Sequence, residues 1–119
     1  MSAVLDEWEQ KVKEELGGLK ALWELYKREY LSPAIARLRG QGTGEALDEA
    51  VELERYGEMV WSLFIEAETE LEHEISARQK GEEVNMAIAA RRVNEALGML
   101  RVYAKGWREK LSALGGEVE

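Results

Sequence analysis

The apolar residues of this chain recur at intervals of three and four, and this period limits its folds more than any other feature. In the first forty residues they lie at Leu5, Trp8, Val12, Leu16, Leu19, Trp23, Tyr26 and Tyr30. Such spacing places them along one side of an α-helix, whereas a half-buried strand would alternate apolar and polar residues. No strand-like alternation competes with the helical period, so the sequence predicts an all-α fold.

Proline and glycine residues divide the chain into segments. The first stripe predicts a helix over about residues 2–31. Ser32 is an expected N-cap, with Pro33 at the first position of a short helix that Gly40 closes. Because proline lacks a backbone N–H and restricts the preceding turn, a long helix must end or kink at Pro33.

Two further stripes predict two more long helices. Thr43 is the expected N-cap of the first, which runs to about Gln79 and ends at Gly81. The last begins near Glu82 or Asn85 and ends at the Gly115–Gly116 pair.

Short connections between long helices make them antiparallel neighbours. The sequence therefore predicts a single helical-bundle domain over residues 1–119. Its expected architecture is an antiparallel bundle of three long helices with a short extra helix or kink after Pro33, that is, a three/four-helix bundle. The 45% apolar share of the residues is sufficient for one hydrophobic core.

The composition also excludes several classes of site. The chain has no cysteine, which rules out disulfides, zinc–thiolate centres and thiol nucleophiles. The first residues resemble no signal peptide, and the uncharged stretch Met59–Ile65 is far shorter than the ~20 residues of a membrane span. We expect a soluble cytoplasmic protein that does not act at a membrane.

The net charge of −8 argues against nucleic acid as a partner, because binding phosphate needs a basic surface. The whole imbalance lies in residues 41–80, which hold eleven acids and three bases. Five glutamates alternate over Glu66–Glu74, with Glu70 expected to face Arg91–Arg92 on the next helix. This segment is interpreted as a solvated helix with paired flanks, as a cation site, or as an acidic surface that attracts a basic partner.

Two helices carry more apolar surface than one stripe requires. The additional residues are Leu47, Val51, Trp61 and Ile65 on one helix, and Met99, Val102, Tyr103 and Gly106 on the next. Three interpretations stay open: packing within the bundle, with Ile35 and Leu38 covering Leu47 and Val51; an oligomer interface, in which Trp, Tyr and Met are enriched; and a ligand pocket. The glycines inside helices indicate close helix packing or space for a ligand. These are Gly17, Gly18, Gly57, Gly98 and Gly106.

The single histidine stands in a short metal-ligand pattern. Glu70 and His73 form an E-x-x-H sequence one turn after Glu66. This spacing resembles half of the pattern in ferritin-like di-iron carboxylate proteins, which implies a metal site completed by a second copy of the chain. However, His73 falls about 160° from the centre of its helix's apolar stripe, which favours a solvent-exposed histidine without a ligand role.

Three functional hypotheses follow. The leading one is a non-enzymatic bundle that acts through self-association, as a homo-oligomer, or through a protein partner, since no nucleophile–base pair or phosphate-binding loop is evident. The second is a natural or de novo designed bundle that binds a small apolar or aromatic ligand such as a porphyrin. The third is a metal-binding bundle using Glu66, Glu70 and His73. No motif identifies a cofactor. The candidate ligand or interface residues are Trp23, Tyr26, Trp61, Phe64, Ile65, Met99, Tyr103 and Trp107.

Overall fold

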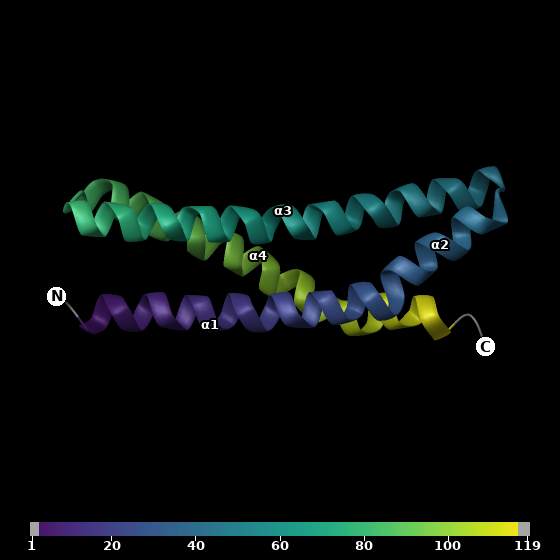
Figure 1. Cartoon of the computed structure of the whole chain (residues 1–119), viewed down its shortest axis with the longest axis horizontal. Helices are drawn as coiled ribbons and strands as arrows, with labels where there is room; N and C mark the ends of the chain where they lie inside the picture. The colour runs from purple at the N-terminus through teal and green to yellow at the C-terminus, as the bar shows by residue number, and fades with distance from the viewer. Residues whose placement is uncertain (1–2, 117–119) are drawn as a thin grey trace.

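The computed structural model describes residues 3–116, and the side chains within residues 7–115. Its elements are α1 (Ala3–Tyr26), the π-helical turn η1 (Lys27–Leu31), α2 (Ser32–Gln41), α3 (Gly44–Lys80) and α4 (Glu83–Gly116). Apart from the two connections, residues 42–43 and 81–82, every described residue is helical. The prediction of an all-α antiparallel bundle is therefore confirmed, with α1, η1 and α2 forming one long bent helix (Figure 1).

The bend lies where Pro33 was expected to end or kink the first helix. The N–H of Ser32 donates to the carbonyl of Lys27, five residues back, so the helix widens by one residue there. The wider turn makes room for the proline ring, which would otherwise clash with the carbonyl four residues before it. Ser32 has helical backbone angles (φ −62°, ψ −42°), so its prediction as an N-cap is wrong although the predicted kink is right.

Capping residues fix the ends of α3 as the sequence predicted. The Thr43 hydroxyl accepts a hydrogen bond of 3.2 Å from the N–H of Ala46, which satisfies an N–H of the first turn. Gly81 closes the helix with φ 73°, a left-handed conformation that favours glycine. The shorter α2 runs past Gly40 to Gln41, and Gly42 takes the left-handed position (φ 71°).

The three long helices are not packed equally against one another. α3 and α4 lie side by side over much of their length, whereas α1 and α3 approach each other closely at few positions. In Figure 1, α1 and α3 follow opposite edges of the molecule, and α4 crosses behind them from α3 towards the end of α1. The result is an elongated molecule of 57 × 23 × 17 Å. Its helix contacts, called seams here, are tight along α4 and loose between α1 and α3.

The main hydrophobic core follows α4, and a small second cluster joins α2 to the start of α3. In the main core, Val60, Phe64, Val93 and Leu100 are completely buried. Within residues 3–116, no helix combines the length and the hydropathy that crossing a membrane requires.

Candidate functional site

Aromatic side chains close the middle of the bundle along α4. The ring of Trp107, on α4, is fully buried, and its centroid lies 5.2 Å from that of Trp23 on α1. Tyr56 of α3 lies 6.1 Å from Trp23 and meets Tyr103 of α4 edge-on at 5.8 Å. Tilted and edge-to-face pairs add about 0.5–1.5 kcal/mol each to the effect of burial. These four residues, called the aromatic cluster, therefore pack against one another and fill the middle of the bundle.

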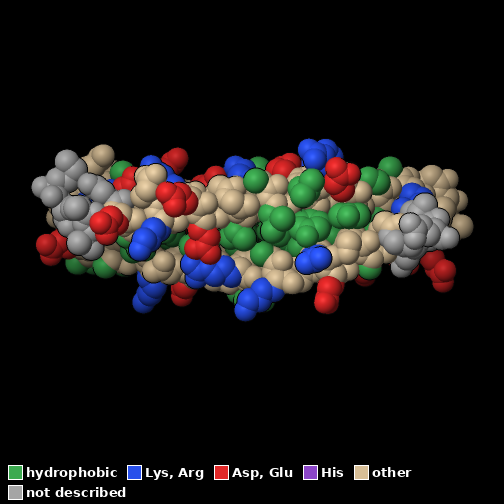
Figure 2. Space-filling model, turned by 90° about the horizontal axis from the view of Figure 1, so that it is seen from below, with side chains coloured by type: hydrophobic (Ala, Val, Ile, Leu, Met, Phe, Trp, Pro, Cys, Tyr) green, Lys and Arg blue, Asp and Glu red, His purple; other side chains and the backbone are tan. Residues whose placement is uncertain are grey.

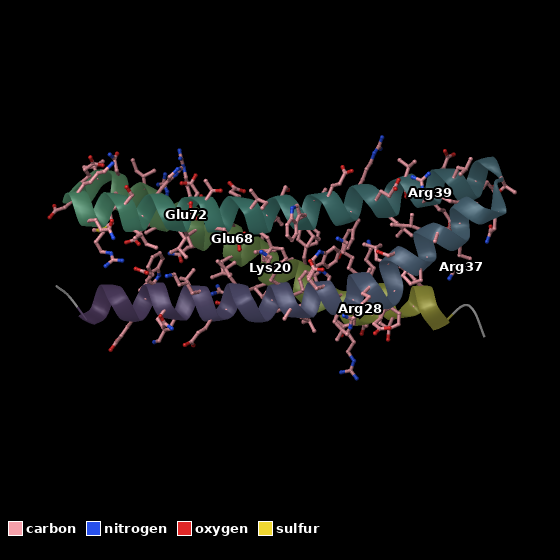
Figure 3. The ribbon with its side chains drawn as sticks, viewed as in Figure 1. Lys20, Arg28, Arg37, Arg39, Glu68 and Glu72 are labelled. Atoms are coloured by element: carbon pink, nitrogen blue, oxygen red, sulfur yellow. The ribbon has the colours of Figure 1, made fainter. Side chains whose placement is uncertain are left out.

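The seam between α1 and α3 is open instead. A hollow of about 500 Å³ lies between the two helices beside Gly17 and Leu71. A second, of about 300 Å³, lies nearer the bend, beside Leu31 and Trp61. Figure 3 looks into this opening, with Lys20 extending from α1 towards α3. The Lys20 ammonium separates the two hollows, because it lies 3.2 Å from Glu68 Oε2 and 5.1 Å from the Trp61 ring centroid.

Opposite charges border the two sides of this opening. The α1 side carries a basic rim that consists of Lys13, Lys20 and Lys27. The α3 side carries an acidic rim that consists of Glu54, Glu58, Glu68 and Glu72. Figure 3 labels members of both rims on their two helices. The opening therefore separates a positive edge from a negative edge.

Only some of these charges are paired within the chain. Lys20 pairs with Glu68 across the opening, and Arg39 of α2 donates to Glu54 at 2.5 Å. The side chains of three rim residues make no hydrogen bond or ion pair with any residue that the structure describes: Lys27, Glu58 and Glu72. Both edges therefore carry charge that remains available to a partner.

An apolar row lies on α3 between the glutamates of the acidic rim, and its Trp61 lines the hollow nearer the bend. The row consists of Leu47, Val51, Trp61 and Ile65, whose exposed fractions lie between 39% and 45%. With the acidic rim it forms two rows with seven-residue spacing, 47–54–61–68 and 51–58–65–72. Residues seven apart lie on the same side of a helix, so each row alternates apolar and acidic side chains.

The structure corrects one interpretation of this row. Ile35 and Leu38 were candidates to cover Leu47 and Val51. Instead, Leu38 packs against Ala46 and Ala50 on the core side of α3. Leu47 and Val51 remain about 40% exposed. Their apolar surface is therefore not accounted for by packing within the described part of the chain.

The glycines inside the helices fall into two groups, one with close neighbours and one without. A Cβ at Gly57 would lie 3.3 Å from Leu31 Cδ2, so this glycine does allow close packing at the bend. At Gly17, Gly18, Gly98 and Gly106 a Cβ would meet no atom within 4 Å among the described residues. Close packing is therefore the wrong interpretation for these four. Gly17 lines the opening between α1 and α3.

A buried carboxylate lies near the other end of α3. Glu74 is 2% exposed, and its Oε1 has no hydrogen-bond partner among the described residues. Burial raises the pKa of Glu74, Arg78 at 3.7 Å opposes this effect, and the nearby Glu9 carboxylate adds to it. Arg78 also bonds to Glu9, which ties this end of α1 to α3. Burial therefore disfavours the ionised form of Glu74, whereas the Arg78–Glu9 contact beside it stabilises the packing of α1 on α3.

A second ionic contact joins α1 to α4. Arg101 donates two hydrogen bonds of 2.6 Å to Glu15, through Nε and a terminal nitrogen. These bonds hold the pKa of Glu15 below its ordinary value. Burial has the opposite effect on Tyr56, whose pKa it raises, while the nearby Trp107 indole lowers it.

The candidate metal residues lie on the α3–α4 side. His73 Nδ1 is 3.1 Å from Glu70 Oε1, and Arg92 reaches the other oxygen of Glu70 at 3.5 Å. The expected pairing of Glu70 with the Arg91–Arg92 region is thus confirmed, and His73 is exposed. Glu66 is exposed as well. Across the described residues, no three His, Asp or Glu side chains converge on a point that a metal ion could occupy.

The other predicted site residues do not form one site. Trp23 and Trp107 belong to the aromatic cluster, and the fully buried Phe64 packs 6.4 Å from the Trp61 ring. Tyr26 is half-buried and stacks on Tyr30. The structure therefore distributes these residues between the core, the opening and the surface of α4.

The exposed apolar residues of α4 lie on a different surface. This outer face of α4 contains Val84, Ile88, Met99 and Val102, and Val84 and Val102 are 73% and 66% exposed. The half-buried Tyr103 beside it donates its hydroxyl to the sulfur of Met59. Figure 2 shows a further gathering of hydrophobic side chains along the middle of the molecule as seen from below.

Sequence reasoning found the apolar row but missed the basic rim opposite it. The first forty residues are neutral overall, so their net charge gave no indication of a positive surface. The available signal was the recurrence of Lys13, Lys20 and Lys27 at seven-residue intervals, which places the three on one side of a helix.

Comparison with protein-family models, with curated proteins and with solved structures found no match to this chain.

Proposed function

We propose that this chain is a non-enzymatic protein-interaction module, and that it binds an α-helical partner through its α1–α3 face. This face comprises the opening, the apolar row and the two charged rims. The observation that supports the proposal most strongly is the apolar row, which stays exposed beside an opening instead of packing against α1. Exposed apolar surface next to polar edges is typical of protein-binding surfaces.

The geometry of the opening favours a helix as the partner. A helix fits lengthwise between two antiparallel helices, and its side chains fill the hollows between theirs. The apolar row offers contacts at the period of helix packing, and Trp61 supplies the large aromatic side chain that commonly contributes much of the binding energy. A partner here would complete a four-helix arrangement that the chain alone leaves unfinished.

The two rims would determine the partner and its orientation more than its affinity. Exposed ion pairs contribute only about 0–1 kcal/mol each, whereas like charges placed together disfavour wrong orientations. A helix with an acidic edge towards α1 and a basic edge towards α3 satisfies both rims. The apolar row would then supply the affinity and the rims the direction.

A fluorescent apolar dye tests whether this face is the binding surface. At about 1 µM protein, where a micromolar complex is dissociated, the dye should bind beside the apolar row. The test variant combines Leu47→Gln, Val51→Gln, Trp61→Gln and Ile65→Gln. The matched control combines Val84→Gln, Ile88→Gln, Met99→Gln and Val102→Gln on the outer face of α4.

We expect the test variant to lose most of the dye fluorescence and the control to keep it, with both remaining helical by circular dichroism. The opposite result, with loss of fluorescence in the control and not in the test variant, would assign the exposed binding surface to α4. That outcome would overturn the proposed function.

A further inference from the structure

We infer that the occupant of the α1–α3 face is a second copy of this chain, docked about a two-fold axis parallel to the helices. The inference rests on the proposed function and names its partner. It is carried by the opposite charges of the two rims, by their equal spacing, and by the charges that have no partner within the described chain.

The rims of one copy are complementary to those of another. Rotation by 180° about an axis along the helices places α1 of one copy over α3 of the other, since the axis exchanges the two sides of the opening. Each basic rim then faces an acidic rim, and this contact occurs twice. A two-fold axis across the helices would instead place α1 on α1 and bring the basic rims together. The charges therefore select the first arrangement.

The spacing along the two rims also matches. Lys13 and Lys27 are separated by fourteen residues, as are Glu58 and Glu72. At ~1.5 Å per residue, both separations are roughly 21 Å. Because α1 and α3 are antiparallel, Lys27 shares the stretch of the opening that contains Glu58, and Lys13 shares the stretch that contains Glu72. The axis thus brings Lys27 to the partner's Glu58 and Lys13 to the partner's Glu72.

These residues have capacity for the new contacts. Lys27, Glu58 and Glu72 make no ion pair with any other described residue. Lys13, whose side chain is 53% exposed, pairs only with Glu9, one turn before it on its own helix. The bridging pair, Lys20 with Glu68, stays intact at the centre, where two such pairs would alternate around the axis.

The face is also large enough for a stable dimer. Figure 1 views the molecule onto this side, and the molecule as a whole extends over 57 × 23 × 17 Å. The two rows of α3 run over residues 47–72, roughly 38 Å, and over the 23 Å width of the molecule this length matches the roughly 800 Å² that each partner contributes to a typical stable interface. Gly17, which lines the opening with no atom within 4 Å of its added Cβ, would let the partner's helix approach α1 closely.

A charge exchange tests both the partner and the arrangement. One variant carries Lys13→Glu and Lys27→Glu, so each of the contacts that the axis makes at these positions places glutamate against glutamate. The other carries Glu58→Lys and Glu72→Lys, so each of them places lysine against lysine. Matched controls make the same exchanges, also fourteen residues apart, on exposed positions of α4: Arg91→Glu with Lys105→Glu, and Glu95→Lys with Glu109→Lys. The mass of each is measured by sedimentation equilibrium at about 100 µM, above a micromolar Kd.

The inference predicts twice the 13.5 kDa chain mass for the native protein and for both controls. Each rim variant alone should remain at 13.5 kDa, with self-association weakened about 100-fold. A one-to-one mixture of the two rim variants should restore the double mass, because each exchanged glutamate then faces a lysine of the other variant. Helicity by circular dichroism verifies that every variant is folded.

A native chain that stays at 13.5 kDa would overturn the second copy as occupant. So would dissociation of the controls to the same degree, or a mixture of rim variants that remains monomeric. Each of these outcomes leaves the proposed function in place, because that proposal depends on where the dye binds. Loss of dye binding in the α4 control alone would overturn the function itself.

Discussion

The seam along α4 and the seam between α1 and α3 differ in how closely their side chains pack. Along α4, Trp107 contacts rings from the neighbouring helices and is completely buried. Between α1 and α3, Trp61 stays 39% exposed under Lys20, beside the hollow of about 300 Å³. Two tryptophans of one small bundle therefore have different roles: the first stabilises the fold, and the second is available to a partner.

The difference shows where this chain has apolar surface in excess of what its own fold uses. A three-helix bundle needs each helix to contact two others, and α4 meets that requirement for both α1 and α3. The direct contact between α1 and α3 is limited to a few positions, among them the ion pairs of Lys20 with Glu68 and Arg78 with Glu9 and the ring contact of Trp23 with Tyr56. A seam with few contacts is the one that a partner can complete at the smallest cost to the fold.

The largest expected effect separates the two tryptophans. Trp107→Ala should lower the free energy of unfolding by about 3–5 kcal/mol, because it removes a fully buried aromatic side chain and leaves a cavity. Trp61→Ala should cost less, about 2 kcal/mol, because 39% of its surface is already in water. Urea denaturation at about 1 µM protein, below a micromolar dimerisation constant, measures both. Equal losses would contradict the distinction between a closed and an open seam.

An intermediate effect is expected at Glu74. Because burial raises the pKa of Glu74, the folded state takes up a proton at pH values between 4.5 and this raised pKa. The free energy of unfolding therefore falls as the pH rises through that window. Glu74→Gln removes this titration, so the variant should gain stability over the native protein from pH 4.5 towards neutrality. Thermal unfolding at several pH values measures the difference.

The opposite behaviour is expected of Glu15, which serves as the control. Its pKa is lowered by the Arg101 hydrogen bonds, so its contribution is present above pH 4.5 and is lost as the pH falls through the folded-state pKa. Glu15→Gln should therefore be less stable than the native protein at neutral pH and approach it in acid. If the difference in the free energy of unfolding between Glu74→Gln and the native protein did not change with pH, burial would not raise the pKa of Glu74.

The smallest effect compares two glycines. Gly17→Ala should raise the free energy of unfolding by up to about 1 kcal/mol, because alanine favours the helix and its Cβ enters open space. Gly57→Ala should give a smaller gain, because its Cβ must displace the Leu31 side chain at 3.3 Å. Chemical denaturation of both variants, with Gly18→Ala as a second open position, measures the order. A larger gain at Gly57 than at Gly17 would contradict the close packing at the bend.

Most of the fold could be predicted from local patterns. The helical period, the Thr43 cap and the Gly81 terminus each act within a few residues, so the sequence contains the whole cause. The bend at Pro33 was predicted for the same reason. The π-helical form of the bend was not, because a single proline can be accommodated by a break, a new cap or a wider turn.

The candidate site could be predicted only in part. The excess apolar surface on α3 is visible as a second row beside the first, so Trp61 and Ile65 were found. The basic rim depends on which side of α1 faces the opening, and the loose α1–α3 seam depends on how far apart α4 holds those two helices. Both are tertiary properties, and the neutral net charge of residues 1–40 conceals the lysines on one side.

NMR spectra of a dilution series test most directly whether the α1–α3 face is the surface that becomes covered, because the indole N–H signals of Trp61 and Trp107 report on the open and the closed helix contact in one spectrum. Between about 10 and 500 µM native protein, we expect the Trp61 signal to move with concentration as the α1–α3 face becomes covered. The Trp107 signal should stay in place throughout, since its ring is already enclosed. A Trp61 signal that does not move over this range, or a Trp107 signal that moves with it, would contradict the account.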